Sequence, residues 1–386
     1  MKKLILSMLA IATLTFTSCS DDNEENNNNG IILNENDLRG SLESGQEATL
    51  DPSKVYLLNG PFIVKAGAKL TIPAGTVIKA TEALADTNGV RYIAVAQGGQ
   101  IFINGTASNP VVMTSNKAVP ESSDWGGLVI CGKADTNKGG STGQTAQAEV
   151  SDLTYGGTVA NDNSGVIKYL RLEYTGYAYN STKEFNGLSL FGVGSGTTIE
   201  YVQAYKNGDD GIEFFGGTVN GKYLISLDSE DDAIDFADGW AGTGEYWYIK
   251  NTAKAGIEGS NNGDNGAATP VTNATLRNIS IVKGTSAGSE HGMYIKEGGG
   301  KWNCQNIYID GFTKGIKIKN STEDPAANGF VDAGDVTFNP IYFGTSVTQD
   351  SEYVGTNATY LTVGANTGAG NNELTPTWAT GWTRGL

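Results

Sequence analysis

The sequence predicts an all-β protein, folded as a single-stranded, right-handed parallel β-helix with a cap at each end. Three observations lead to this prediction: a short motif that recurs with a period near 23, apolar alternation between the repeats, and many turn-forming residues. Periods of roughly 20 to 50 residues are typical of solenoids, in which equivalent residues of successive coils stack in columns.

The recurring motif places Gly or Ala before an aliphatic residue, which is followed by any residue and usually by another apolar one. Its leading residues are 24, 22, 23, 36 and 23 positions apart, and weaker copies lie upstream. The six copies are Asn186-Gly-Leu-Ser-Leu, Asp210-Gly-Ile-Glu-Phe, Asp232-Ala-Ile-Asp-Phe, Ala255-Gly-Ile-Glu-Gly, His291-Gly-Met-Tyr-Ile and Lys314-Gly-Ile-Lys-Ile.

Segments between the motifs alternate apolar and polar residues, as strands do, for example 167–174 and 276–282. Two or three short strands fit in each coil, and parallel crossovers are almost always right-handed. Two Gly- and Asn-rich stretches, 137–163 and 259–270, interrupt the period, and we expect both to be insertions. Insertions on one face of a solenoid often mark its binding side.

Composition narrows the function further. The 386 residues carry a net charge of -16, so nucleic acid and bare anionic membranes would be repelled. Cys131 and Cys304 lie on well-separated coils and are predicted to be buried free thiols. The single histidine and these two thiols also argue against a zinc site.

The N-terminus has the pattern of an export signal. Lys2 and Lys3 precede an apolar run that ends at Thr17-Ser18-Cys19, which resembles a bacterial lipoprotein cleavage box. We therefore predict a signal peptide at 1–18, a lipid on Cys19 and a mature charge of -18 once Lys2 and Lys3 are removed. The remaining predicted regions are an acidic tether at 19–30, the β-helix at 31–320 and a C-terminal cap at 321–386.

Several long motifs resemble a group of secreted or lipid-anchored Bacteroidetes proteins. They are Asp124-Trp-Gly-Gly-Leu-Val-Ile-Cys-Gly, Asn186-Gly-Leu-Ser-Leu-Phe-Gly-Val-Gly-Ser-Gly, Gly208-Asp-Asp-Gly-Ile-Glu-Phe-Phe-Gly-Gly and Trp378-Ala-Thr-Gly-Trp-Thr. The resemblance covers nearly all of the mature chain. It implies a right-handed, pectate-lyase-like β-helix and a location on the surface of the outer membrane, and it implies little about activity.

Carboxylates gather around the motif column. On successive coils at about 4.8 Å spacing, such charges must be protonated, bound to a cation or well solvated. One interpretation is a calcium site that links coils, and the other is a set of solvated turn residues that bind backbone amides. The candidate metal ligands are Asp209, Asp210, Glu213, Asp231, Asp232, Asp235 and Glu258.

A third interpretation is catalytic, with Asp210, Asp231, Asp232 and His291 as candidates. The column resembles that of the polygalacturonase-type glycoside hydrolases, in which paired carboxylates flank a glycosidic bond. The match is partial: Lys254 and Ala255 stand on the coil where a histidine belongs, and His291 comes one coil late. A lone histidine beside Glu290 can equally be a hydrogen-bonded surface residue.

The aromatic residues Trp240, Tyr246 and Trp247 follow the acidic coils and are candidates for stacking on a sugar. We expect a binding or accessory module, with a glycan or peptide ligand, in an assembly with a SusC/SusD-like importer or other surface lipoproteins. The alternatives are a glycan-cleaving enzyme and a structural or adhesive surface protein. Calcium is the one cofactor that the sequence suggests.

Overall fold

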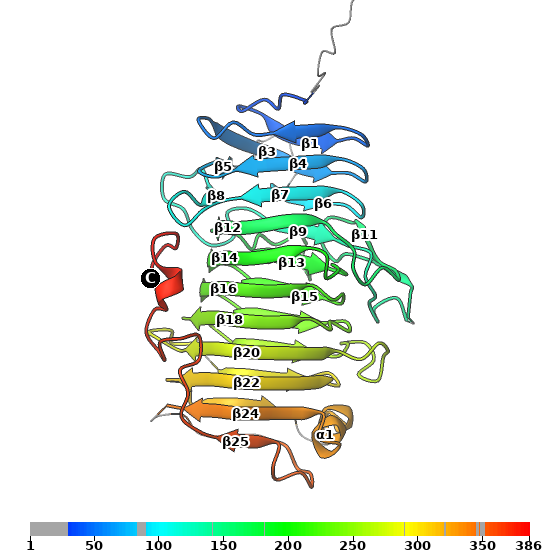
Figure 1. Cartoon of the computed structure of the whole chain (residues 1–386), viewed down its shortest axis with the longest axis vertical. Coiled ribbons are helices and arrows are strands. Elements are labelled where there is room, and N and C mark those ends of the chain that lie inside the picture. The colour runs from blue at the N-terminus through cyan, green and yellow to red at the C-terminus, as the bar shows by residue number, and fades with distance from the viewer. Residues whose placement is uncertain are drawn as a thin grey trace, which may run out of the picture.

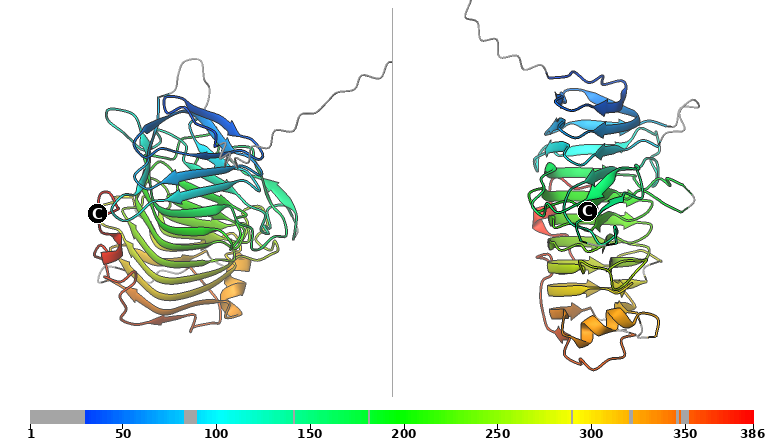
Figure 2. Two further views of the ribbon diagram at one scale, coloured as in Figure 1. Left: turned by 45° about the horizontal axis from the view of Figure 1, so that its top comes forward. Right: turned by 90° about the vertical axis from the view of Figure 1, so that its right-hand side faces the viewer.

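The computed structural model shows a parallel β-helix, which confirms the predicted fold class (Figure 1). It describes residues 30–82, 90–140, 142–180, 182–288, 290–319, 322–344, 347 and 352–386. The predicted signal peptide, Cys19 and the tether up to residue 29 lie outside the described residues. Strands of successive coils pair in parallel in one sheet of 23 strands, which wraps around the axis (Figure 2).

The N-terminal coils are built from short strands whose buried and exposed residues alternate. In β3, for example, every second side chain points into the core. These strands are β1 (Leu38–Leu42), β2 (Glu47–Thr49), β3 (Val55–Val64), β4 (Lys69–Pro73), β5 (Val77–Ala80), β6 (Ile93–Val95), β7 (Gln100–Asn104), β8 (Val111–Ser115) and β9 (Leu128–Cys131).

Later coils use one long, bent strand to cover two faces of the helix. At the bend, most of these strands have a residue with positive φ, such as Tyr201 and Asn278. The long strands are β12 (Gly165–Glu173), β14 (Thr198–Asn207), β16 (Asn220–Ser229), β18 (Thr243–Lys250), β20 (Asn273–Val282), β22 (Lys301–Asp310) and β24 (Val336–Phe343).

The recurring motif forms the third face. It supplies β13 (Leu188–Phe191), β15 (Ile212–Phe215), β17 (Ile234–Ala237), β19 (Ala255–Ser260), β21 (His291–Lys296) and β23 (Lys314–Ile318). These strands pair in sequence order after β9, and the aliphatic residue of each motif aligns with that of the next: Leu188, Ile212, Ile234, Ile257, Met293 and Ile316.

The motif glycine is required by close packing between coils. A Cβ atom on Gly211 would lie 2.6 Å from the carbonyl oxygen of Ala233, and one on Gly292 would lie 2.7 Å from that of Gly315. Real Cβ atoms do not approach oxygen so closely, so Gly211 and Gly292 are needed where these coils pack, although the third copy of the motif carries Ala233 at the same position.

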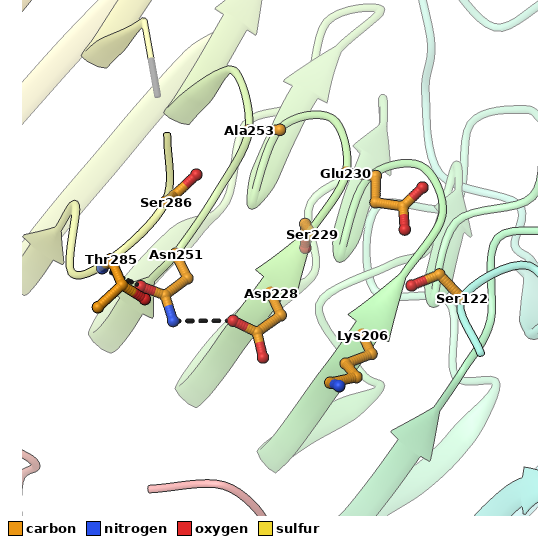
Figure 3. Close-up of a pocket in the computed structure, with 9 residues that line it drawn as sticks. All are labelled: Ser122, Lys206, Asp228, Ser229, Glu230, Asn251, Ala253, Thr285 and Ser286. Atoms are coloured by element: carbon orange, nitrogen blue, oxygen red, sulfur yellow. Dashed lines mark hydrogen bonds between the residues drawn. The ribbon is translucent and has the colours of Figure 1, made fainter. Parts of the chain in front are cut away.

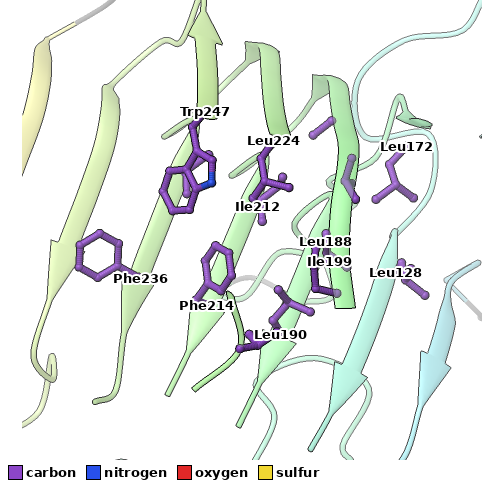
Figure 4. Packing of buried hydrophobic residues seen from close by; sticks show 14 of the residues in the cluster. Leu128, Leu172, Leu188, Leu190, Ile199, Ile212, Phe214, Leu224, Phe236 and Trp247 are labelled. Carbon is purple, nitrogen blue, oxygen red and sulfur yellow. The ribbon is translucent and has the colours of Figure 1, made fainter. Parts of the chain in front are cut away.

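Inside the helix, apolar side chains stack coil upon coil (Figure 4). The rings of Phe214 and Trp240 lie 4.7 Å apart, and those of Phe236 and Trp302 lie 4.6 Å apart. Buried indoles keep their hydrogen bonds: Trp247 Nε1 donates to the carbonyl of Gly221. Cys131 and Cys304 are buried and free, as predicted.

Both predicted insertions lie beside the motif face. The first carries the hairpin β10 (Thr145–Gln147) and β11 (Thr154–Gly156), and it packs Ala148, Val150 and Tyr155 on the outer side of β13 and β15. Asn137 joins the two insertions, because its amide donates to Asn261 and accepts from Asn262.

Residues 322–386 contain α1 (Pro325–Asp332), β24, β25 (Leu361–Val363) and a 3₁₀ turn at Thr377–Ala379. From about residue 366 the chain runs back along the outside of the long strands, and its end lies beside the middle coils (Figure 1). We call residues 366–386 the strap. In the described part of the chain, no helix has the length and apolarity needed to cross a membrane.

Candidate cation site

Seven carboxylates lie together on the outer side of three neighbouring motif strands. Strand register stacks Glu213 on Asp235 and Asp235 on Glu258, with Ser189 and Tyr294 as the neighbours at either end. We call this surface the acidic face; its carboxylates are Asp209, Asp210, Glu213, Asp231, Asp232, Asp235 and Glu258.

The leading residues of the motif are fixed by backbone hydrogen bonds between coils. The amide of Asp232 donates to Asp210 Oδ1 at 2.9 Å, and the amide of Ala255 donates to Asp232 Oδ1 at 2.5 Å. One oxygen of each carboxylate thus accepts a backbone hydrogen bond, as expected if these were turn residues that bind amides. They are not solvated, however, since Asp210 and Asp232 are only 7% and 4% exposed.

Two groups of three carboxylates each bring one oxygen per residue within 4.8 Å of the others. The inner triad is Asp210, Glu213 and Asp235, and the outer triad is Asp209, Asp210 and Asp231. Asp210 belongs to both, which places the two triads side by side.

Lysines neutralise only part of this charge. Lys254 Nζ lies 2.5 Å from Asp231 Oδ1, and Lys296 Nζ lies 2.5 Å from Glu258 Oε1. No ion pair with Lys or Arg is seen for the inner triad among the described residues. The unbalanced charge therefore lies on the other five carboxylates, which include all three of the inner triad.

Burial is the main cause of strong pKa shifts in this cluster. It raises the pKa of Asp210, Glu213, Asp232 and Asp235 well above the usual carboxyl range, and neighbouring carboxylates raise it further. Burial and the charge of Asp231 raise the pKa of Asp209 to about 7. Such groups gain most when a cation, or a proton, compensates their charge.

The donor atoms suit a hard divalent cation. Every candidate ligand atom is an oxygen, and calcium binds roughly six to eight oxygen ligands in a flexible geometry. Two buried neighbours add unpartnered oxygens: Asn186 Oδ1 and Ser189 Oγ, in residues that are 1% and 0% exposed. The buried acidic cluster can therefore hold a metal ion, and softer metals that favour nitrogen or sulfur have no matching ligands here.

Glu149 is a further carboxylate that acts electrostatically on the acidic face, and the sequence pattern did not indicate it. It lies between Ala148 and Val150, which are buried against the outer side of β13 and β15, and its charge raises the pKa of both Asp209 and Glu213. The only signal in the sequence was its place in an insertion near the motif column.

His291 does not join the acidic face. It lies two coils beyond Asp232, about 10 Å along the axis at the usual strand spacing. The residue is 7% exposed, its Nε2 lies 3.7 Å from Glu290, and burial together with Lys317 lowers its pKa. The structure therefore brings Asp210, Asp231 and Asp232 together and leaves the histidine apart from them.

Two of the three aromatic candidates are core residues. Trp240 and Trp247 are fully buried, so the expectation that they stack on a ligand is wrong: Trp247 points inward from β18, and Trp240 points inward from the turn that precedes this strand. Tyr246 lies outside, stacked 5.1 Å from Tyr223, on a different face from the acids.

A polar hollow lies next to the acidic face along the chain (Figure 3). Within it, Asn251 Nδ2 donates to Asp228 Oδ1 at 2.8 Å, and Asn251 Oδ1 accepts from the amide of Thr285. Glu230 lines the hollow and directly precedes Asp231, so a ligand bound at the outer triad would border this hollow.

The fold and its acidic face define a β-helix protein with a largely buried acidic cluster that could hold a metal ion. The chain belongs to the pectate-lyase-like beta helix domain family, whose domain matches residues 40–383. No curated protein matches it.

Two solved structures are similar. The periplasmic alginate epimerase AlgG shares 12% identity at a TM-score of 0.40, over 83% of this chain and 84% of that one. The Dettilon tailspike protein shares 13% identity at a TM-score of 0.30, over 83% of this chain and 62% of that one. Neither similarity bears on the activity of this chain.

Proposed function

We propose that this protein is a surface-exposed, lipid-anchored binding module whose ligand site depends on a divalent cation, calcium being the best fit. The observation that carries the proposal is the inner triad: two buried carboxylates and one half-buried carboxylate with raised pKa values, close together and without an ion pair to Lys or Arg among the described residues. A calcium ion there would compensate the negative charge of these carboxylates in place of bound protons.

The N-terminal pattern supports the location. Cys19, preceded by an apolar run and followed by acidic residues, resembles the lipid anchor and export signal of Bacteroidetes surface lipoproteins. The natural setting would be an outer-membrane nutrient-uptake assembly with a SusC/SusD-like importer or other surface lipoproteins. The ligand would be a glycan or peptide that offers oxygen atoms to the cation.

The outer triad explains how a ligand could reach such an ion. Asp209 and Asp231 are partly exposed, whereas Asp210 and Glu213 are buried, so the site opens toward solvent on one side. The neighbouring hollow, whose lining residue Glu230 directly precedes Asp231, adds the hydroxyl-bearing side chains of Thr285 and Ser286.

The test is binding of the purified protein to panels of glycans and peptides, with calcium and with a chelator. We expect a ligand that binds in calcium and is released by the chelator. Binding that ignores the chelator would contradict the role of the cation. Gentle solubilisation of the outer membrane should recover the protein with a transporter, and recovery alone would count against the assembly.

The same glycan panel tests the enzymatic alternative. New reducing ends that appear with the wild type and vanish in Asp232→Asn, with the fold intact, would replace the binding module with a glycan-cleaving enzyme. We expect no such activity, because Asp232 Oδ1 is held by the amide of Ala255 and His291 lies two coils away.

A further inference from the structure

We propose that the acidic face holds two divalent cations that share the carboxylate of Asp210. This inference rests on the proposed cation site and goes beyond it, because it fixes the number of ions, their ligands and their order of binding. The inner triad would hold one ion and the outer triad the other, since each places three carboxylate oxygens within 4.8 Å of one another.

Two buried residues beside Glu213 carry further oxygens that could serve the inner site. Asn186 Nδ2 donates to Glu213 Oε2 at 2.5 Å, which fixes the amide against the triad and leaves its Oδ1 without a partner. Ser189 precedes Glu213 in the same outward column, and its buried Oγ is also unpartnered. An unpartnered buried oxygen is costly, and a hard cation satisfies amide, hydroxyl and carboxylate oxygens alike.

Charge also favours two ions. The seven carboxylates of the acidic face exceed Lys254 and Lys296 by five charges when all are ionised. One divalent cation leaves a surplus of three and a second leaves a surplus of one. Glu149 adds a further carboxylate from the insertion, so two ions do not overcompensate the site.

The two sites should differ in affinity. In the outer triad, the ammonium of Lys254 already lies 2.5 Å from Asp231 Oδ1 and competes with an incoming ion for that carboxylate. The inner triad has no such competitor among the described residues, and it is the more deeply buried. We infer that the inner ion binds first and tightly, and that the outer ion binds second and weakly.

The experiment is a calcium titration of the purified protein by calorimetry, with bound metal counted after equilibrium dialysis. The wild type should take two ions in two phases. Glu213→Gln should lose the tight phase, Asp209→Asn the weak phase, and Asp210→Asn both. Lys254→Gln should tighten the weak phase by about tenfold or more, because the competing ammonium is removed. Glu245→Gln, on a different face, should bind like the wild type.

The outcomes separate this inference from the proposed function. One ion per chain, with ligand binding still dependent on calcium, overturns the shared site and leaves the binding module standing. No bound ion at any concentration overturns both. Circular dichroism checks that each variant folds; should Asp210→Asn unfold, the opposite losses in Glu213→Gln and Asp209→Asn still decide the matter.

Discussion

Replacing Glu213 by Gln should stabilise the protein in a chelator and reverse that effect in calcium. The substitution keeps the shape of the side chain and removes one charge from the inner triad. Glu213 shares the 4.8 Å cluster with Asp210 and Asp235, and Asn186 donates a hydrogen bond to its Oε2. An amide oxygen can accept the same hydrogen bond.

The magnitude follows from the spacing. Two like charges 4.8 Å apart repel by about 3.5 kcal/mol at an effective dielectric constant of about 20. The wild type already relieves part of this repulsion by binding protons, as the raised pKa values show, and the weaker hydrogen bond to Asn186 offsets about 1 kcal/mol more. The expected net gain for Glu213→Gln in a chelator is therefore about 1–3 kcal/mol.

Calcium at a high enough concentration should invert the order. A ligand at 1,000 times its dissociation constant stabilises the folded state by about 4.1 kcal/mol, which exceeds the expected gain, and the variant would lose that contribution from the tight site. Urea unfolding followed by tryptophan fluorescence measures both conditions, with Glu245→Gln as the matched control on β18. If Glu213→Gln is less stable than the wild type in chelator, the carboxylates of the inner triad do not repel one another appreciably, and the electrostatic argument fails.

Three further predictions concern other parts of the molecule. Trp382→Ala should cost about 3–5 kcal/mol, because the indole is fully buried in the strap, while Val354→Ala at an exposed site should change little in the same urea titration. Asp238 is buried and its pKa is raised to about 6, so it contributes stability below its unfolded value of 3.8 that is lost as pH rises toward 6. The unfolding free energy of Asp238→Asn should therefore rise relative to that of the wild type by on the order of 1–3 kcal/mol between pH 4 and pH 7. A constant difference in unfolding free energy across that range would refute the raised pKa of Asp238. Gly211→Ala should destabilise by about 2 kcal/mol or more, since its Cβ would meet Ser226 Oγ at 2.3 Å; unchanged thermal unfolding would show that the coils can separate.

The fold could be predicted from the sequence because the same motif recurs in successive coils. Gly211 and Gly292 are needed where coils touch, and Ile212, Ile234 and Ile257 stack in the core, so period and residue type agree. The acids of the site followed from the same register. Glu213, Asp235 and Glu258 occupy the same outward position in successive copies of the motif, so their alignment follows from the spacing of the copies.

The features that could not be predicted from the sequence depend on side-chain orientation and on packing between distant segments. Inward and outward positions are hard to separate from sequence in turns and where strands bend, so the sequence does not show that Trp240, in a turn, and Trp247, beside a bend, point into the core. Glu149 acts electrostatically on Glu213 from the hairpin of the first insertion, which follows no period. This interaction joins segments about 60 residues apart and has no signature along the chain.

The strap holds together coils that are not neighbours. The guanidinium of Arg384 lies 2.7 Å from Glu173 on β12, Trp382 packs edge-on against Tyr169 and Tyr201, and Tyr308 on β22 donates to Glu373. These contacts span the long strands from β12 to β22.

An unbraced solenoid behaves as a one-dimensional array, in which each coil senses only the next and fraying can start at either end. A longitudinal tie changes that behaviour, because opening one coil strains the tie at several others. Unfolding should then approach an all-or-none event over the central coils, which include the strands of the acidic face. Such long-range cooperativity would also raise resistance to proteases, since local opening is the step that proteolysis exploits.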